Sequence, residues 1–568
     1  MANGFGSLFI GASGLQNAQS ALNTTANNLS NVGTTGYVRQ QVRFADKNYN
    51  KLKDGCRNVN MQQYGLGVGI GDVVHARDIF LDKRYRQNYG CKEFYSVRAE
   101  SADYVTDLLQ EMHGEQFKNS ISDFWQACQE LSTENEVTVY QNLVVEKAEL
   151  LISRAKTLYS DFQKYQSNLN EQIEDDVDRV NEIGERIYEL NLDIQKIEAG
   201  GVETAMTLRD ERDNLLDELG AYGMIEIKED QTGFVYVDFE RTRFIDENRA
   251  YEIALKRDKL TGFETPYWTH LSDVEKELYV PVFHLDNAAQ TDIRFDTGKI
   301  KSKMIVRGDQ YGTAADMENA QTYDKIAGST VTVVEAQMDK LMSSIMMAIN
   351  DVFCPNVETT EDIALADGTN LPAGTLILDT ENCARGSDGK LPPRELFTRA
   401  DVDRYREVTG DDGKTYYVYN APKDGDIDSQ YSITNVSVNE DLKKQVSLTP
   451  AFLENGTVAF KLAKKFSDAW NETGMKLNPY DEKPCNFEDY YNRVIVELGL
   501  EGNIYKSATD TMEGAMYSID NKRQQIMGVS SDEELTQMIK YQSAYNAASR
   551  FMTVISEMTE LIVTGLGR

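Results

Sequence analysis

All ten prolines of this 568-residue chain lie between Pro266 and Pro484, which leaves the first 265 and the last 84 residues without any. Proline removes a backbone hydrogen-bond donor and clashes with the preceding helical turn, so long proline-free segments permit long helices. The distribution therefore predicts a mainly α fold with helical ends and a β-rich middle. The chain is also longer than one hydrophobic core usually supports, so we expect about two to four domains.

The N-terminal segment repeats a large side chain at every seventh position: Leu8, Leu15, Leu22 and Leu29. Small residues lie three positions after the first three leucines: Gly11, Ala18 and Thr25. This spacing is typical of a coiled-coil helix whose small residues let a partner helix approach closely. The segment contains no charged side chain before Arg39. We expect Gly33 to follow the end of the helix in the left-handed conformation.

The C-terminal segment has a matching pattern after Ser531 and Glu534, which are spaced as a capping box at the start of a helix. One apolar row follows at steps of three and four: Met538, Tyr541, Tyr545, Ala548, Met552, Ile555, Thr559, Ile562 and Leu566. A second row lies beside it: Ala544, Ala547, Phe551, Val554, Met558 and Leu561. A helix that is apolar over most of its circumference must be buried from several sides, which one short N-terminal helix cannot achieve. We therefore expect neighbouring copies of the chain to supply the missing surface.

The remaining proline-free part of the N-terminal half predicts a long helix from Leu151 to Ile197, spanning roughly 70 Å. Gly200 and Gly201 follow it, and the segment LRDERDNLLDEL at residues 208–219 predicts an antiparallel helix that returns along it. Further helices are expected at about 92–130, 322–353 and 487–527. Helices of these lengths indicate an elongated packing rather than a compact globule.

The middle of the chain has strand patterns separated by turns. Alternating runs flank Thr232-Gly233 within residues 224–240 and Asp412-Gly413 within residues 405–420, so we expect two β-hairpins. Residues 278–285 predict one more strand. The alternate glycines of residues 65–71 miss the GxGxxG spacing and favour an extended segment over a nucleotide site.

The charge balance excludes two classes of partner. With 92 acidic and 59 basic residues, the formal net charge is -33, whereas a nucleic-acid-binding protein needs a basic surface. An anionic membrane surface is disfavoured for the same reason. No apolar run approaches the roughly 18 residues of a membrane span, and no Sec-type signal begins the chain. We expect no nucleic acid and no membrane among the partners.

Residues that could support catalysis or metal binding do not converge in the sequence. Neither paired ligand spacing nor a metalloprotease motif occurs among the four histidines: His75, His113, His270 and His284. Asp424, Asp426 and Asp428 lack the glycine and distal glutamate of an EF-hand, which favours solvated turn residues over a calcium site. No CxxC pair occurs among the six cysteines, which favours buried free thiols: Cys56, Cys91, Cys128, Cys354, Cys383 and Cys485. We therefore expect no catalytic residue, no cofactor and no metal, and a protein that is not an enzyme.

The polar stretch behind the N-terminal helix carries a family resemblance. Its ANNLSN at residues 26–31, followed by Thr35-Gly36-Tyr37, resembles the signature of the flagellar rod, hook and hook-associated axial proteins. Within that group, residues 141–219 and the segment GVSSDEELTQMIKYQSAYNAASRFM at 528–552 resemble the hook-associated protein 1 (FlgK) family. The resemblance is specific over about residues 5–240 and 525–568.

This resemblance implies a structural role at the junction between the flagellar hook and filament, in the extracellular part of the flagellum. The implied partners are further copies of the chain, the hook protein, the second hook-associated protein (FlgL) and an export chaperone that holds the C-terminal region. The implied route is export of the unfolded chain through the flagellar type III apparatus. Two alternatives remain open: another hook or rod axial subunit, and a flagellum-borne hydrolase whose active site lies in the variable middle.

The resemblance also implies three regions, namely paired terminal coiled-coil helices that line a channel, an elongated helical bundle and a β-rich outer part. We expect them at 1–45 with 530–568, at 46–230 with 310–355 and 485–529, and at 231–309 with 356–484. The terminal helices should be largely disordered in a monomer and fold as copies stack.

The predicted assembly interface combines both terminal helices and the signature: Leu8, Leu15, Leu22, Leu29, Asn27, Asn28, Asn31, Gly36, Tyr37, Met538, Tyr541, Tyr545, Met552, Ile555 and Ile562. The three asparagines allow two interpretations. Their amides can form neutral hydrogen bonds between packed helices, or they can cap one helix end.

Overall fold

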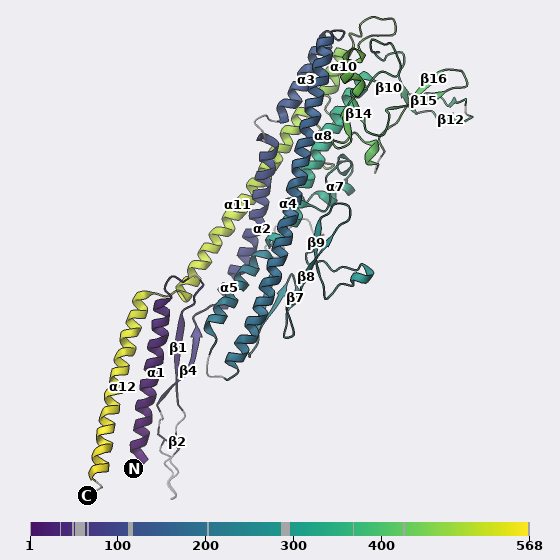
Figure 1. The fold of residues 1–568 in the computed structure, drawn as a ribbon. Coiled ribbons are helices and arrows are strands. Elements are labelled where there is room, and N and C mark those ends of the chain that lie inside the picture. The colour runs from purple at the N-terminus through teal and green to yellow at the C-terminus, as the bar shows by residue number, and fades with distance from the viewer. Residues whose placement is uncertain are drawn as a thin grey trace.

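The computed structural model describes residues 2–34, 36–47, 50–51, 63–64, 67–111, 117–200, 204–285, 296–366, 368–423 and 426–565. Some residues discussed above lie outside these ranges: Thr35, Cys56, Gly65, His113, Gly201, Asp424 and Leu566. The described chain forms an elongated rod of helices whose two termini lie together at one end (Figure 1). The mainly α fold with helical ends is confirmed.

The rod consists of a thin end and a thicker body. Helices α1 (Ala2–Ser30) and α12 (Ser531–Gly565) lie side by side at the thin end (Figure 1). The body contains the long helices α2 (Ile79–Glu111), α4 (Thr138–Glu198) and α11 (Phe487–Met527). Helix α5 (Met206–Tyr222) returns antiparallel to α4, as predicted. The remaining helices are α3 (Phe117–Thr133), α6 (Lys299–Arg307), α7 (Ala320–Ile326), α8 (Thr330–Phe353), α9 (Glu440–Lys444) and α10 (Leu462–Asn471).

Three predicted helices differ from the observed ones at their ends. Helix α4 has 61 residues and begins at Thr138 rather than Leu151, because Val144 and Ala148 continue its buried face towards the N-terminus. The helix expected at 92–130 is two helices, α2 and α3. Helix α2 begins earlier because buried Asp82 and Arg86 occupy core-facing positions and hide the apolar period. The helix expected at 322–353 is divided into α7 and α8.

The strands form small antiparallel sheets on the outside of the helices. The predicted hairpin in 224–240 is β5 (Ile225–Glu229) and β6 (Val235–Phe239), extended by β7 (Thr242–Ile245). The hairpin in 405–420 is β15 (Tyr405–Thr409) and β16 (Thr415–Tyr419), in one sheet with β10 (Asn356–Glu358) and β13 (Leu376–Leu378). Both turns place glycine at positive φ, with 82° at Gly233 and 78° at Gly413. Both hairpins are confirmed.

The other strands occur in pairs. They are β1 (Gln40–Asp46) with β4 (Val68–His75), β2 (Asn50–Lys51) with β3 (Gln63–Tyr64), β8 (Ile253–Arg257) with β9 (Glu264–Trp268), β11 (Ile363–Ala364) with β12 (Asn370–Leu371), and β14 (Phe397–Arg399) with β17 (Val436–Val438). The described glycines of the 65–71 stretch lie in or next to β4, which confirms its extended conformation. The strand predicted at 278–285 is wrong. Pro281 and Leu278 form only isolated bridges there, and Pro281 has no N–H for a ladder.

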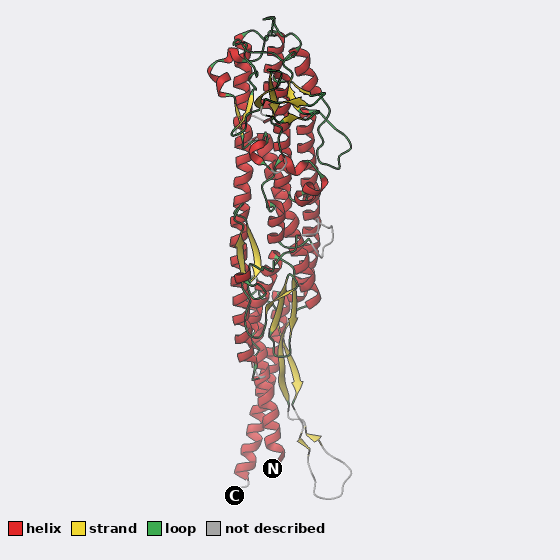
Figure 2. Cartoon of the chain, turned by 90° about the vertical axis from the view of Figure 1, so that its right-hand side faces the viewer, coloured by secondary structure: helices red, strands yellow, loops and turns green. Residues whose placement is uncertain are grey.

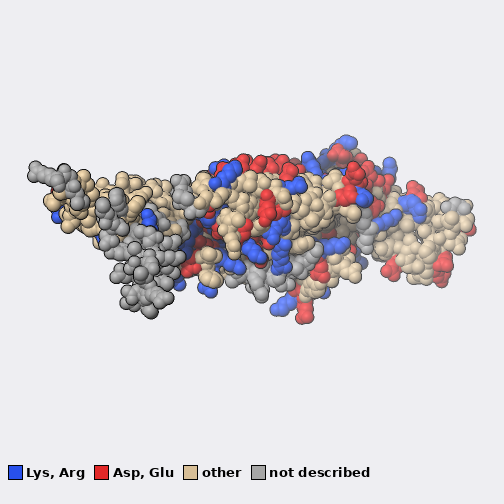
Figure 3. Space-filling view, turned by 90° about the horizontal axis from the view of Figure 1, so that it is seen from below, with Lys and Arg blue, Asp and Glu red and all other residues tan. Residues whose placement is uncertain are grey.

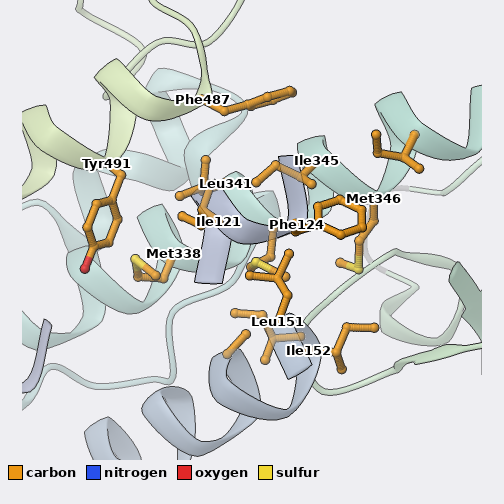
Figure 4. Packing of buried hydrophobic residues seen from close by; sticks show 14 of the residues in the cluster. Ile121, Phe124, Leu151, Ile152, Met338, Leu341, Ile345, Met346, Phe487 and Tyr491 are labelled. Atoms are coloured by element: carbon orange, nitrogen blue, oxygen red, sulfur yellow. The ribbon is translucent and has the colours of Figure 1, made fainter. Parts of the chain in front are cut away.

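Two hydrophobic cores lie along the rod. The first joins α3, the N-terminal half of α4, α8 and α11, and contains Phe124, Leu151 and Leu341 (Figure 4). Side chains from residues 384–485 enter the same core, so this part of the β-rich middle packs onto the helices. The second core lies between the C-terminal half of α4, α5 and the β5–β7 sheet. The body is thus held by helix packing along its length, while β1 and β4 extend beside the terminal helices (Figure 2).

Candidate assembly interface

Helices α1 and α12 approach closely where the N-terminal pattern has small residues. A Cβ atom added to Gly11 would lie 2.6 Å from Sδ of Met552, and one added to Gly14 would lie 3.7 Å from Cβ of Ala548. Ala18 and Thr25, the next small residues of the repeat, are buried. The small residues therefore serve the close helix approach that the sequence predicted.

The four leucines of the repeat are half-buried rather than enclosed. The reason is that α1 has neighbours on two sides, with α12 on one and the β1–β4 pair on the other. On the second side, the amide of Asn17 donates to the backbone oxygen of Val68. All four leucines keep part of their surface exposed.

The two apolar rows of α12 have different environments. In the first row, Met538, Tyr541, Tyr545, Met552 and Ile555 are half-buried, whereas Ile562 near the end of the helix is exposed. Met552 lies against Gly11, and the ring of Tyr541 lies 6.2 Å from that of Phe44 in β1. The first row thus includes the side chains that α12 packs against its own chain.

The second row of α12 is more exposed, although its first large side chain, Phe551, also reaches Gly11, where an added Cβ would lie 3.0 Å from Cδ1 of Phe551. The exposed fraction is 42% for Phe551, 50% for Val554, 59% for Met558 and 75% for Leu561. Within the described part of α12, only Glu534 is buried. A continuous exposed apolar row of this kind marks an interaction surface. Figure 3 shows few charged side chains at the end of the rod where these helices lie.

Asn28 joins three segments of the chain at the base of the helix pair. Its Nδ2 donates to the backbone oxygen of Gln40 at 2.9 Å and to Oε2 of Glu534 at 3.1 Å. Its Oδ1 accepts from the hydroxyl of Tyr37 at 2.8 Å and from the Gln40 N–H at 3.1 Å. The side chain is buried with both donor positions and the acceptor in use. It therefore connects α1, β1 and the first turn of α12.

Glu534 is a partner of Asn28 and Arg39 rather than part of a capping box, so that prediction is wrong. Helix α12 begins at Ser531, and the hydroxyl of the preceding Ser530 accepts from the N–H of Glu533 at 3.5 Å. Arg39 donates from Nε to Oε1 of Glu534 and from Nη1 to Oε2 of Glu533, both at 2.8 Å. The first charged residue of the sequence thus neutralises a buried carboxylate at the opposite end of the chain.

The other signature residues act locally. The amide of Asn31 donates to the backbone oxygen and to Oδ1 of Asn27, at 2.9 and 3.1 Å, on the exposed side of α1. Gly33 has a φ of 88°, as predicted, and Gly36 has a φ of 79°. A Cβ on Gly36 would overlap the side chain of Asn214 in α5, so only glycine fits there. Asn28 thus forms hydrogen bonds between packed segments, whereas Asn27 and Asn31 form hydrogen bonds at the end of α1.

Buried ion pairs connect α11, which leads into α12, to the body. Arg523 of α11 donates to Oδ1 of Asp82 in α2 at 2.8 Å and to Oδ2 of Asp217 in α5 at 2.7 Å. Arg86 donates to Asp217 at 2.6 Å, and Nε of Arg77 lies 3.2 Å from Asp82. Burial alone would raise the pKa of Asp217, but the charges of Arg86 and Arg523 outweigh burial and lower it. The sequence did not reveal this network, because Arg523 and Asp82 are 441 residues apart.

A buried histidine and aspartate complete the junction between thin end and body. Nε2 of His75 lies 3.4 Å from Oδ1 of Asp210, whose Oδ2 accepts from the Val38 N–H. Burial lowers the pKa of His75 to about 4 and raises that of Asp210 to about 7. Near neutral pH the imidazole is therefore uncharged, and the two buried side chains lie side by side between β4 and α5 without a full ion pair.

Buried carboxyl groups in the middle of the chain hold loops in place. Glu335 accepts from the Gly312 N–H at 2.8 Å, and Asp339 accepts from the Ala314 and Ile433 N–H groups at 2.8 and 2.7 Å. Burial raises the pKa of Glu335 to about 8 and that of Asp339 to about 6. Among the described residues, no three His, Cys, Asp or Glu side chains are grouped as metal ligands. The described helices include none that is both long and apolar enough to span a membrane.

Three protein-family models match this chain. The model described as the flagellar hook-associated protein FlgK helical domain covers residues 102–353. The flagella basal body rod protein model covers residues 8–37, and the model of the flagellar basal body rod FlgEFG protein C-terminal region covers residues 523–564. The models thus match both terminal helices and much of the helical body.

Curated relatives match nearly the whole chain. Flagellar hook-associated protein 1 of Bacillus subtilis (strain 168) is 25% identical over 554 residues, which is 97% of this chain and 96% of the relative. The Salmonella typhimurium protein of the same name is 20% identical over 575 residues, at 97% and 98% coverage. A shorter match, 40% identical over 79 residues and 12% of this chain, is to flagellar hook protein FlgE of Treponema pallidum. The solved flagellar hook junction protein FlgK from Burkholderia pseudomallei is 12% identical, with a TM-score of 0.47, and covers 78% of this chain and 99% of its own.

Proposed function

We propose, on the premise that the chain belongs to the flagellar hook-associated protein 1 family, that it is a structural subunit of the bacterial flagellum at the junction between hook and filament. The helical-domain model and the relatives that match 97% of the chain support this role. We propose further that the chain is exported unfolded through the flagellar type III apparatus and polymerises outside the cell.

The observation that carries the polymerisation proposal is the exposed apolar row of α12. In the described part of the chain Val554, Met558 and Leu561 are at least half exposed, and Phe551, which lies beside Gly11, is 42% exposed. The neighbouring α1 carries no charge, so packing copies around a shared axis would bury no unpaired ion in it. In this proposal the first row of α12 holds α1 within one chain, and the second row contacts adjacent copies.

The fifteen predicted interface residues then fall into three groups. The leucines of α1 and the first row of α12 shape the helix pair that is presented to other copies. Asn28 and Tyr37 hold the base of that pair, through the hydrogen bonds to Gln40 and Glu534. Asn27, Asn31 and Gly36 form the chain reversal that connects the pair to the body. Within the first group, Ile562 lies near the end of α12 and is exposed.

The three-region division also remains a proposal. The terminal helices (1–45 with 530–568) would form the inner layer, and the helical bundle (46–230 with 310–355 and 485–529) would surround it. The β-rich parts (231–309 and 356–484) would face outward. The elongated shape supports this radial order, because the thin end carries both termini and the projecting β10–β16 region lies at the far end (Figure 1).

The proposed partners are further copies of this chain, the hook protein, the second hook-associated protein (FlgL) and an export chaperone bound to the C-terminal region. The exposed row of α12 supports the chaperone proposal, because an apolar helix needs cover before assembly. We also propose that the protein is not an enzyme. The buried carboxyls of the middle accept backbone N–H groups and thereby fix loops.

The alternative of a hook or rod subunit rests on the short family-model matches at the two ends. Those matches cover the terminal segments, whereas the helical body between them matches the FlgK helical-domain model. The long α4 and the antiparallel α5 thus favour the hook-associated role over the other axial subunits. No observation favours a hydrolase in the variable middle.

The test is deletion of the gene followed by complementation. Cells without the protein should build hooks that lack filaments and should release flagellin into the medium. Leu561→Asp should fail to restore filaments, because it places a charge in the exposed apolar row. Thr553→Asp adds the same charge to a polar position of the same helix and should restore them. Normal filaments after deletion would refute the junction role.

A further inference from the structure

One side of the body carries an apolar groove with an acidic rim. The groove, of about 350 Å³, lies between α11 and the α7–α8 region, and Val333 and Leu498 form part of its wall. Leu500 and Ile504 line its outer edge and are 59% and 66% exposed. Leu500 and Ile504 lie on α11, well away from the terminal helices. They therefore belong to a different surface from the second apolar row of α12.

The rim of the groove carries two glutamates, of which Glu501 accepts a hydrogen bond from the hydroxyl of Tyr505 at 2.6 Å. Glu497 and Glu501 lie one turn apart on α11 and both line the groove. Burial and the charge of Glu501 raise the pKa of Glu497. Arg493, one turn further along, is paired with Asp481 at 2.5 Å, and neither groove glutamate takes part in an ion pair among the described residues. A basic group placed at this rim would relieve the repulsion.

The turn between β8 and β9 has the complementary chemistry. Leu260 at its tip is 95% exposed. Exposed Lys256, Arg257 and Lys259 precede it, which is unusual in a chain with a net charge of -33. The carboxylate of Asp258 accepts from the N–H groups of Leu260 and Thr261, both at 2.9 Å. The turn is therefore a fixed basic projection that carries one large apolar side chain.

The groove and the turn are two separate surfaces of the body. Helix α11 packs on α2 and α8, and α4 packs on these helices as well, while β8 and β9 pack on α4 (Figure 1). Because the two surfaces are different, a contact between the turn of one copy and the groove of another copy is heterologous. Repetition of such a contact closes a ring or continues as a helix.

We propose that the β8–β9 turn of one copy docks into the α7–α8–α11 groove of the next copy, with Leu260 against Leu500 and Ile504 and Lys259 at Glu501. The inference rests on the proposed function, because it requires the chain to assemble with itself. It adds a second, outer contact to the one proposed for the terminal helices.

Mixed copies that each carry one added cysteine test the contact directly. One version of the full chain carries Leu260→Cys and the other carries Ile504→Cys, and the two are assembled together and mildly oxidised. A disulfide-linked dimer should form only when both versions are present, and the unsubstituted chain gives the background of the native cysteines. Pairing Leu271→Cys with Ile504→Cys is the matched control, because Leu271 is exposed on a nearby loop outside the turn. Dimers no more abundant than in this control would overturn the proposal.

Charge reversal gives an independent test. Lys259→Glu and Glu501→Lys should each weaken assembly, and the double variant should restore it. Leu260→Asp should weaken the contact roughly tenfold to hundredfold, as expected for losing one buried leucine. Lys259 and Leu260 are exposed, so the monomers of their variants should unfold thermally like the parent. Glu501→Lys also removes the hydrogen bond from Tyr505, so its own thermal unfolding is measured and the restoration by the double variant decides.

The outcomes separate this inference from the proposed function. If Leu561→Asp abolishes assembly while Lys259→Glu and Glu501→Lys leave it intact, the groove contact is wrong and the terminal-helix interface stands. If the parent chain does not assemble with itself, both proposals fail. Restoration by the double charge reversal supports the groove contact specifically.

Discussion

Replacing Arg523 by methionine tests whether buried ion pairs hold α11 to the body. The guanidinium is 5% exposed, contacts Asp82 at 2.8 Å and Asp217 at 2.7 Å, and lies 4.2 Å above the ring of Tyr85. Methionine keeps the packing of the side-chain stem and removes the charge. Breaking a buried ion pair by removing one partner costs about 3–5 kcal/mol, because the other charge stays buried.

The expected loss is smaller than that range, because each acid keeps one cation. Asp217 retains Arg86 at 2.6 Å, and Asp82 retains Arg77 at 3.2 Å. We therefore expect Arg523→Met to lower the free energy of unfolding by about 2–3 kcal/mol at pH 7. The control is Arg243→Met, whose exposed guanidinium has one aspartate partner, Asp238 at 3.0 Å, and one ring, Tyr236 at 5.4 Å. An exposed pair contributes about 0–1 kcal/mol.

The pH dependence gives a second criterion for the same variant. An aspartate whose pKa is lowered in the folded state contributes stability above about pH 4, and this contribution is lost as the pH falls through the folded-state pKa. The pKa of Asp217 is lowered by Arg86 and Arg523 against the effect of burial. The deficit of Arg523→Met should therefore be full at pH 7 and shrink below about pH 4. Urea unfolding followed by circular dichroism measures both values. Equal losses for the two variants at pH 7 would refute the reasoning.

Three further predictions concern the helix pair and the buried acids. Gly11→Leu should separate α1 from α12, because Met552 occupies the space of the new side chain. Gly6→Leu is the control and should leave the helix pair in place, because a Cβ at Gly6 meets no atom within 4 Å. Cross-linking between the two helices measures the difference. Asn28→Leu should block junction formation in cells, because it leaves the groups of Gln40, Tyr37 and Glu534 without their partner, and Asn31→Leu should have little effect. Normal filaments with Asn28→Leu would favour a mere capping role. The pKa of Glu335 is raised to about 8, so its burial lowers the free energy of unfolding as the pH rises from about 4.5 to 8. Glu335→Gln should therefore flatten the pH profile of the unfolding free energy over that range. An unchanged profile would contradict this prediction.

Local patterns predicted those parts of the fold that depend on neighbours in sequence. The helical ends followed from the absence of proline, and the two hairpins followed from turns in which Gly233 and Gly413 take positive φ. The start of α2 was missed, because buried Asp82 and Arg86 are satisfied by partners far away in sequence and leave no apolar period.

In the candidate interface, too, the sequence predicted the local patterns but not the contacts between distant segments. The pattern identified both apolar rows of α12, but not which side chains contact α1, because both rows are equally apolar. In the structure Met552 and Ala548 of the first row lie against Gly11 and Gly14, and Phe551 of the second row also reaches Gly11. The pattern also identified Asn28 without its role. The partner Glu534 is 506 residues away, and the sequence placed this glutamate in a local capping box instead.

Amide hydrogen exchange along residues 532–565, compared between a verified monomer and the assembled protein, tests the central claim most directly. The proposal that the exposed row of α12 is completed by neighbouring copies predicts rapid exchange in the monomer and strong protection after assembly, with residues 2–34 following the same change. The long helices of the body should be protected in both states. Full protection of residues 532–565 in the monomer, or no gain in protection on assembly, would contradict the claim that these helices form the assembly interface.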